Sequence, residues 1–273
     1  MKEDNKPYKL GIALSGGGAK GFAHLGAMQA LKDAGISPDL ISGTSAGALA
    51  GVLMADGHEP KDIISFFQEK AFTKFAQITV PKSGLFKSTR FYSFLEEHLR
   101  ARTFEELKTP LHVVATDIEQ GKSHTFSSGP LIPAIVASCS FPIIFTPVEI
   151  EKQHYVDGGI FKNFPVSVIR KKCDKIIGIN VSPLNLAEYK DSIKYILERS
   201  YHYLSVSNTL LDRTLCDYLL ELNNLSKYPM FDLDHCQEIF DTGYEFTSKY
   251  LEENIELLKK NINYMFSPEK EEV

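Results

Sequence analysis

The chain has 273 residues and carries 30 Lys and Arg against 35 Asp and Glu, which gives a formal net charge of −5. Hydrophobic residues make up 43% and charged residues 24% of the chain, which is ordinary globular usage and excludes a disordered, collagen-like or coiled-coil protein. Lys and Arg are scattered rather than gathered into a basic stripe, which argues against nucleic acid as a partner.

Cysteine usage and apolar stretches indicate the compartment. Four cysteines form neither a CxxC pair nor a His/Cys cluster: Cys139, Cys173, Cys216 and Cys236. We therefore predict no disulfide framework, no metal site and no cofactor, and a reduced cytoplasmic chain fits best. The longest mostly apolar stretch, residues 46–55, has about half the length of a membrane-spanning helix. Any membrane contact is expected to be peripheral, at the inner membrane surface.

The first 55 residues repeat one unit, a strand followed by a glycine-rich turn and a helix. The apolar run 8–14 predicts a buried strand, and apolar residues at helical spacing over 20–34 predict a helix that ends at Gly35. The same order of elements follows at once: strand 38–42, turn 43–47 and helix 48–55.

Strands and helices continue to alternate along the chain. Helices are predicted at 61–69, 89–99 and 130–138, and strands at 111–117, 121–126, on both sides of residues 152–153, and at 175–181. Residues 71–86 have weak periodicity and predict a loop or lid, and the chain beyond residue 184 is expected to be mainly helical. Alternation of this kind predicts one α/β domain of three layers, with a mostly parallel central sheet between helices.

A G-x-S-x-G pattern lies between the second strand and the following helix, which is where a nucleophile elbow belongs. Its members are Gly43, Thr44, Ser45, Ala46 and Gly47. Small residues two positions before and after the serine let neighbouring backbone approach, so that Ser45 projects its hydroxyl above the sheet. Alone the pentapeptide is more typical of a tight packing turn, but the strand before it and the helix after it favour chemistry.

A glycine-rich loop follows the first strand and also opens a helix. Its candidate residues are Gly16, Gly17, Gly18, Lys20 and Gly21. Consecutive glycines leave backbone amides free to hold an oxyanion or a phosphate. The loop also fits the dinucleotide pattern G-x-G-x-x-G, but the second strand ends in Gly-Thr-Ser rather than in the acidic residue that a ribose needs. A P-loop is excluded because Gly-Lys-Ser/Thr is missing.

The third pattern is Asp157-Gly158-Gly159, at the end of a predicted strand. A D-G-G tripeptide is usually only a turn. Here it gains weight because a serine needs a base, and a buried carboxylate at a glycine turn is able to take the serine's proton directly.

Together these motifs resemble those of bacterial patatin-like phospholipases of the short, single-domain kind. In that family a glycine-rich oxyanion loop, a G-x-S-x-G elbow and a D-G-G or D-G-A motif occur in this order and supply a Ser-Asp dyad. The segment Ala137 to Pro142, with Pro147 beyond it, also resembles the family's A-S-x-x-x-P segment. Lys20 stands where many relatives have Arg, and D-G-G replaces the D-G-A of plant relatives, and neither change threatens the chemistry.

The resemblance covers residues 8–182 and implies a patatin-like catalytic core there, with 1–7 as an N-terminal extension. Residues 183–267 would form a helical part packed on the same domain, and 268–273 a frayed tail. The implied activity is hydrolysis of a lipid or acyl-ester substrate such as a phospholipid or lysophospholipid. Ser45 would be the nucleophile and Asp157 the base, with the glycine loop as the oxyanion hole.

Histidine is not required by these motifs. His24 is expected to pack near the glycine loop, and His154 is expected on a strand face, with tuning of Asp157 as its alternative role. A Ser-Asp-His triad would need His202 or His235, and neither has supporting context. A dyad is therefore predicted.

Two aromatic groups lie outside the motifs. One is expected to pack beneath a long loop or to form a lid toward acyl chains or a membrane: Phe66, Phe67, Phe72, Phe75, Ile78, Val80, Leu85 and Phe86. The other is expected to pack between helices or to form a homodimer face: Tyr201, Tyr203, Tyr244, Phe246 and Tyr250. Two other function classes stay open, a catalytically idle regulator or adaptor with this fold and a dinucleotide-binding enzyme.

Overall fold

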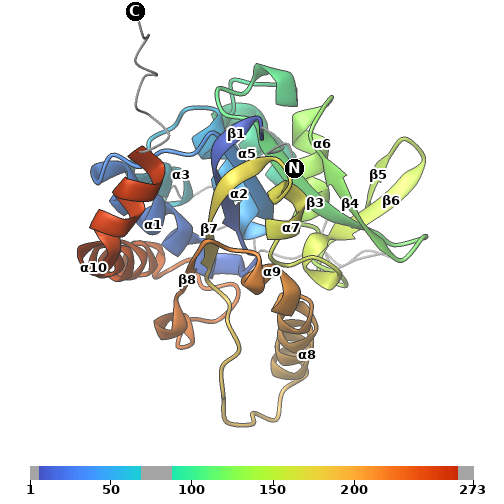
Figure 1. The fold of residues 1–273 in the computed structure, drawn as a ribbon. Coiled ribbons are helices and arrows are strands. Elements are labelled where there is room, and N and C mark those ends of the chain that lie inside the picture. Colours follow the sequence, from blue (N-terminus) through green and yellow to red (C-terminus); the bar gives the residue numbers. More distant parts are fainter. Residues whose placement is uncertain (1–5, 69–87, 264–273) are drawn as a thin grey trace, which may run out of the picture.

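An eight-stranded sheet forms the middle of the computed structural model, which describes residues 6–68 and 88–263 (Figure 1). The strand order is β5-β6-β3-β2-β1-β7-β8, and β4 pairs with β3 beside this path. The strands are β1 (Tyr8–Leu14), β2 (Leu40–Thr44), β3 (Leu111–Asp117), β4 (Lys122–Phe126), β5 (Val148–Ile150), β6 (Gln153–Asp157), β7 (Cys173–Asn180) and β8 (Tyr218–Glu221).

The centre of the sheet is parallel and one side of it is antiparallel. Strands β3, β2, β1, β7 and β8 all run in the same direction, whereas β4 and β6 pair antiparallel with β3, and β5 with β6. Every residue of β2 and β3 is buried, as expected for strands covered on both faces. Because β1 and β2 are parallel, their carboxyl ends reach the same edge of the sheet, where the glycine loop and Ser45 follow.

Helices cover both faces of the sheet and create two apolar cores. The larger core includes Leu25, Leu53 and Ile135, and the smaller one includes Phe164 and Ile169. The helices are α1 (Phe22–Asp33), α2 (Ala46–Ala55), α3 (Pro60–Gln68), α5 (Thr89–His98), α6 (Leu131–Ser138), α7 (Val166–Ile169), α8 (Ile193–Ser207), α9 (Leu210–Thr214) and α10 (Cys236–Asn263). The predicted α/β fold class, a central sheet between helices, is confirmed.

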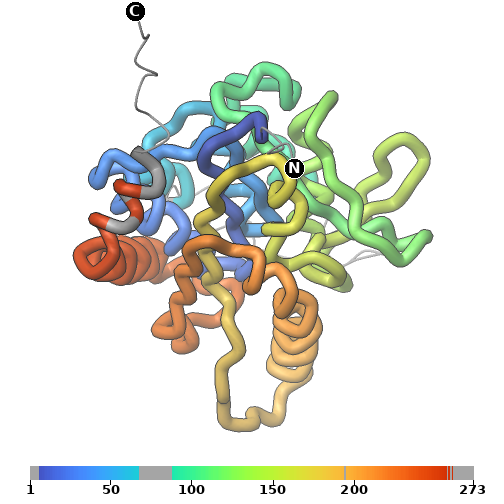
Figure 2. Tube along the Cα trace, viewed as in Figure 1, coloured from blue at the N-terminus to red at the C-terminus, as the bar shows by residue number. Residues whose placement is uncertain are grey.

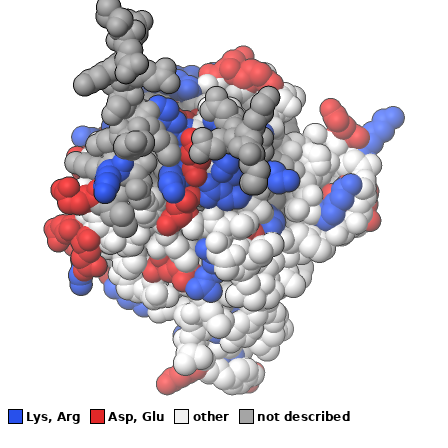
Figure 3. Space-filling model, viewed as in Figure 1, with Lys and Arg blue, Asp and Glu red and all other residues white. Residues whose placement is uncertain are grey.

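The C-terminal third contributes helices α8 to α10, as expected, and one strand that periodicity did not predict. Strand β8 has only four residues and extends the sheet by pairing parallel with β7. Figures 1 and 2 show α8 and the segment before it projecting from the rest of the molecule. In Figure 3 this projection is mainly uncharged, and Leu186 and Ile193 there are 98% and 88% exposed.

The predicted loop or lid at 71–86 lies outside the described residues. Phe66 and Phe67 belong instead to α3, and Phe67 is buried, with its ring edge-on to that of Phe22 at 5.1 Å. Among the helices of residues 6–68 and 88–263, we find none with the length and apolar character to cross a bilayer.

Candidate active site

Ser45 occupies a sharp turn between β2 and α2. Its φ of 52° and ψ of −121° are strained for a residue with a side chain, at a cost on the order of 1–3 kcal/mol. A Cβ on Gly43 would stand 2.6 Å from the Ala48 nitrogen, and one on Gly47 would meet the Leu14 carbonyl. Both glycines thus permit the close backbone packing that the elbow interpretation required.

Helix α6 holds the backbone of Ser45 from the side. The Ser45 N–H donates to Ser138 Oγ at 2.8 Å, and the Ser138 hydroxyl donates onward to the Val114 carbonyl at 2.6 Å. The Cys139 thiol donates to the Ser45 carbonyl at 3.3 Å. Ser138 is part of the segment whose sequence pattern was recognised, and its contacts give that pattern a physical role.

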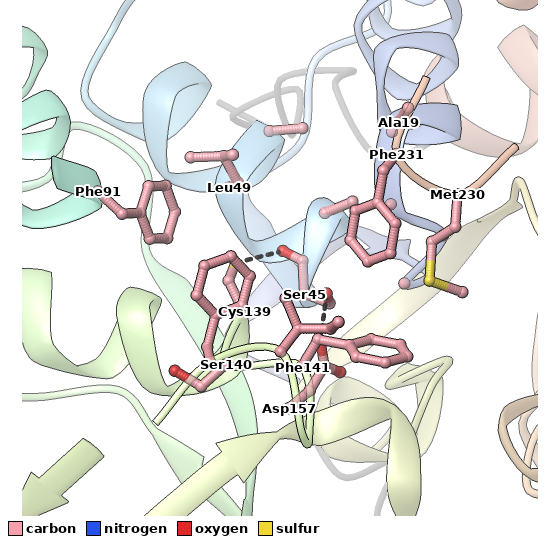
Figure 4. Close-up of a pocket in the computed structure, with 18 of the residues that line it drawn as sticks. Ala19, Ser45, Leu49, Phe91, Cys139, Ser140, Phe141, Asp157, Met230 and Phe231 are labelled. Carbon is pink, nitrogen blue, oxygen red and sulfur yellow. Dashed lines mark hydrogen bonds between the residues drawn. The ribbon is translucent and has the colours of Figure 1, made fainter. Parts of the chain in front are cut away.

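Asp157 meets Ser45 although 112 positions separate them in the chain. The Ser45 hydroxyl donates to Asp157 Oδ2 at 2.6 Å, and Figure 4 shows the two side chains pointing toward each other. Asp157 ends β6, where its own N–H donates to the Ser140 carbonyl at 2.9 Å. Gly158 follows directly, and a Cβ there would stand 2.8 Å from the Val114 carbonyl carbon. The fold thus brings the two residues of the predicted dyad into hydrogen-bond contact.

The Asp157 carboxylate is 2% exposed. Burial raises its pKa above the ordinary value, while hydrogen bonds from the Ser45 hydroxyl, the Gly159 amide and the Tyr201 hydroxyl oppose that rise. Gly159 and Tyr201 both donate to Oδ1 at 2.8 Å, which leaves Oδ2 for Ser45. A carboxylate with a raised pKa, in contact with a hydroxyl, is suited to accept a proton.

The backbone amides of the glycine loop near Ser45 differ in whether they have a hydrogen-bond partner. The Gly16 N–H donates to the Asn163 carbonyl at 2.9 Å, so this amide already has a partner and its role as an oxyanion donor stays a prediction. The Gly17 and Gly18 amides have no hydrogen-bond partner within the described part of the chain. Gly18 has a φ of +59°, and a Cβ there would collide with the Met230 carbonyl.

Lys20 and Gly21 lie at the far end of this loop, in the 3-10 turn Gly18–Gly21. A Cβ on Gly21 would stand 2.7 Å from that of Ala46, so Gly21 lets the turn pack against α2. Lys20 is not among the residues that line the cavity, and burial, followed by the charge of Arg199, lowers the pKa of its ammonium group. A contribution of Lys20 to the oxyanion hole stays a prediction.

A mainly apolar cavity of about 420 Å³ opens above Ser45 and Asp157. Its size is within the range of about 300–1,000 Å³ that is usual for small-molecule sites. Figure 4 shows the rings of Phe91 and Phe231 on either side of Ser45. The apolar wall also includes Leu49, Leu53, Ile63, Phe67, Phe141 and Phe145.

The C-terminal third reaches this site in a way that the sequence did not reveal. Tyr201 of α8 was expected only in helix packing or a dimer face, yet its hydroxyl contacts the Asp157 carboxylate. Asn208, which caps the same helix, donates to the carbonyls of Gly159 at 2.9 Å and Ile160 at 3.1 Å and accepts from the Asn163 N–H at 2.8 Å. A four-residue spacing of Leu197, Tyr201 and Ser205 was the available signal.

The histidines lie elsewhere. His24 is buried, and burial lowers its pKa to about 4, so neutral Nε2 donates to the Ser15 carbonyl at 2.8 Å. His154 is paired with Glu119 rather than with Asp157. His202 contacts Ser182 Oγ at 3.3 Å, and His235 is paired with Asp232.

Comparison with known proteins places the chain in a family. The family model described as patatin-like phospholipase matches residues 12–169, more than half of the chain. The chain belongs to the patatin-like phospholipase family. Whether it is bacterial, and of the short single-domain kind, stays a prediction, as does the division at residue 182.

Two relatives show the range of similarity in sequence. An uncharacterized NTE family protein of Mycobacterium tuberculosis is 31% identical over 163 residues, which are 59% of this chain and 45% of that protein. An uncharacterized protein of Acanthamoeba polyphaga mimivirus is 26% identical over an alignment that covers 88% of this chain and 95% of its own. The chain thus spans under half the length of the mycobacterial relatives that it matches.

Two solved structures share this patatin-like fold. VipD from Legionella pneumophila superposes with a TM-score of 0.52 at 15% identity, covering 90% of this chain and 67% of that one. Human GIVD cytosolic phospholipase A2, in complex with methyl gamma-linolenyl fluorophosphonate and terbium chloride, gives a TM-score of 0.50 at 12% identity, covering 97% and 61%. At these identities the likeness concerns the fold alone.

Proposed function

We propose that this protein is a serine acyl-ester hydrolase that acts on lipid esters through a dyad of Ser45 and Asp157. The observation that carries the proposal is the 2.6 Å hydrogen bond from Ser45 Oγ to Asp157 Oδ2 beneath an apolar cavity. Membership of the patatin-like phospholipase family supports a lipid as the substrate class. A phospholipid or lysophospholipid is the proposed substrate, with peripheral contact to the membrane that holds it.

The first half of the reaction begins with proton transfer from Ser45 Oγ to Asp157 Oδ2. The serine oxygen then attacks the ester carbonyl carbon, and the carbonyl oxygen becomes an oxyanion. Gly17 and Gly18 line the cavity, and their amides, which have no partner among the described residues, are the proposed donors to it. Asp157 next returns the proton to the leaving alcohol, which departs and leaves an acyl-serine.

Water completes the second half. Asp157 takes a proton from water, the resulting hydroxide attacks the acyl-serine carbonyl, and the fatty acid leaves as Ser45 recovers its proton. The apolar wall of Leu53, Phe67 and Phe91 gives the acyl chain a surface that excludes water. The paired contacts of His202 and His235 elsewhere support a dyad rather than a triad.

Labelling with a fluorophosphonate probe tests the proposal, because such probes form a covalent bond with an activated serine. Wild-type protein should be labelled and the Ser45→Ala variant should not. Ser140→Ala is the matched control, because Ser140 also lines the cavity but its hydroxyl donates to the Val136 carbonyl at 2.7 Å. Equal labelling of the wild type and the Ser45→Ala variant would defeat the hydrolase proposal.

A further inference from the structure

The two oxygens of the Asp157 carboxylate have different surroundings. Oδ2 faces Ser45, whereas Oδ1 accepts one hydrogen bond from the Gly159 amide and one from the Tyr201 hydroxyl, each at 2.8 Å. The Gly159 donor is local, two residues along the chain. The Tyr201 donor comes from a helix 44 positions away, so its presence at this oxygen depends on how α8 packs.

Helix α8 presents one side to the site and another to solvent. Leu197, Tyr201 and Ser205, spaced by four residues, all line the cavity. On the other side, Ile196 and Tyr203 are 49% and 51% exposed. Position 201 is therefore fixed on the inner side of α8 by helical spacing.

Packing also fixes the ring of Tyr201. Its centroid is 4.3 Å from that of Phe141, which in turn lies 5.8 Å from the ring of Phe231. Asn208, at the end of α8, bonds to the backbone of Gly159 and Ile160. The helix that carries Tyr201 is thus tied to the loop that carries Asp157, so the hydroxyl and the carboxylate keep one geometry.

We propose that Tyr201 is a positioning residue of the dyad. Its hydroxyl holds Asp157 Oδ1 so that Oδ2 faces Ser45, and this hydrogen bond also favours the ionised form of the carboxylate. The inference rests on the proposed function and adds a residue to it. The three donors to this buried carboxylate are neutral groups, so none of them brings a positive charge that would stabilise the ionised form. Each hydrogen bond therefore makes a large contribution to keeping the base unprotonated.

The chemistry of Tyr201 suits a permanent donor. Burial, together with the neighbouring Asp157 charge, holds the pKa of its phenol well above the ordinary value of 10. The phenol therefore keeps its proton throughout the working pH range. Removing this donor raises the pKa of Asp157, because it takes away one of the hydrogen bonds that oppose the effect of burial.

The test is the pH dependence of fluorophosphonate labelling in the wild type and in Tyr201→Phe. Because Asp157 activates Ser45 only when ionised, labelling slows as the pH falls through the pKa of Asp157. Tyr201→Phe loses a hydrogen bond to a charged group, which should move the low-pH side of the rate profile, its acid limb, upward by about one pH unit. At a pH on this acid limb, labelling should therefore become about tenfold slower. Tyr195→Phe is the matched control, since it removes a hydroxyl from the same helix that donates to the Glu188 carbonyl.

A second variant guards against a packing defect. Incorporation of 3-fluorotyrosine at position 201 keeps the ring and makes the phenol a stronger donor, so the acid limb should move to lower pH. Opposite shifts in the two variants are not expected from a purely structural role. Acid limbs that coincide with that of the wild type, in a folded and labelled protein, would overturn the inference about Tyr201 and leave the hydrolase proposal intact. A wild type without Ser45-dependent labelling would overturn both.

Discussion

The two catalytic candidates are held in place by different kinds of structure. Ser45 and the glycine loop lie within the first 55 residues, where consecutive strands, turns and helices position them. Asp157 is held by Tyr201 of helix α8, 44 positions later, and its loop is held by Asn208, which caps the same helix and lies 49 positions after Gly159. The nucleophile side is thus built on consecutive elements of the first 55 residues, with Ser138 and Cys139 holding the Ser45 backbone. The base side depends in addition on helix α8 from the C-terminal third.

Further hydrogen bonds join these regions beside the one between Ser45 and Asp157. The Thr44 hydroxyl donates to the Lys162 carbonyl at 2.7 Å, and the Gly16 amide donates to the Asn163 carbonyl at 2.9 Å. Both acceptors lie in the loop after Asp157. The contrast teaches that motif residues supply the reacting groups, while residues without a motif set the distance between them. Variants on each side are therefore expected to fail in different ways.

The largest effect on activity is expected from Asp157→Asn. The amide keeps the shape of the side chain but is unable to take the Ser45 proton, so kcat for ester hydrolysis should fall about 10³-fold. Esterase kinetics at neutral pH measure the loss. Asp117→Asn is the control, since Asp117 is also buried but accepts from the backbone amides of Glu119 and Gln120. A fall below tenfold in Asp157→Asn would remove the carboxylate as the base.

A smaller loss should follow from Gly18→Ala on the nucleophile side. The added Cβ meets the Met230 carbonyl at a φ of +59°, so the loop has to move and one proposed oxyanion donor is displaced. Turnover should fall on the order of 10²–10³-fold. Gly35→Ala is matched, because Gly35 has a φ of +78° but open space around it, and should cost about 1 kcal/mol of stability with no loss of turnover. Equal turnover of both variants would exclude the loop from catalysis.

The sequence reveals the nucleophile side more fully than the base side, for a physical reason. Tight turns restrict which residues fit, so Gly43, Gly47 and Gly158 record the geometry of Ser45 and Asp157 in the sequence itself. Tyr201 obeys no such local restriction. Its phenol is compatible with many positions on a helix, and only tertiary packing brings it to the carboxylate.

The same reasoning explains the other differences between expectation and structure. Four residues of β8 are too few to show alternation, and pairing with β7 creates the strand. Gly16 looks equivalent to Gly17 and Gly18 in sequence, but the Asn163 carbonyl already accepts its amide. Which donors are free depends on partners 100 or more positions away, and this information is absent from a local motif.

On the base side, Asn208→Ala should cause a moderate defect. It removes hydrogen bonds to Gly159, Ile160 and Asn163, which should destabilise the fold by about 1–3 kcal/mol and slow fluorophosphonate labelling about tenfold. Denaturant unfolding and labelling rates measure the two effects. Asn223→Ala changes an exposed amide that donates only a 3.4 Å bond to the Glu221 carbonyl, so neither quantity should change. Labelling of Asn208→Ala at the wild-type rate would show that the base loop holds its position without α8.

The smallest effect is expected from His235→Ala, which tests whether a histidine belongs to the base side at all. Its Nδ1 donates to Asp232, and that hydrogen bond raises the pKa of His235. A raised pKa in the folded state stabilises the protein below the unfolded value of about 6.5, and this contribution is lost as the pH rises through the folded value. The melting temperature of the variant should thus fall slightly near pH 5 and match the wild type near pH 8. Esterase activity should be unchanged at both pH values, because His235 is paired away from Ser45 and Asp157. Loss of activity as severe as that of Asp157→Asn, in a folded variant, would replace the dyad with a triad and give the C-terminal third a reacting group of its own.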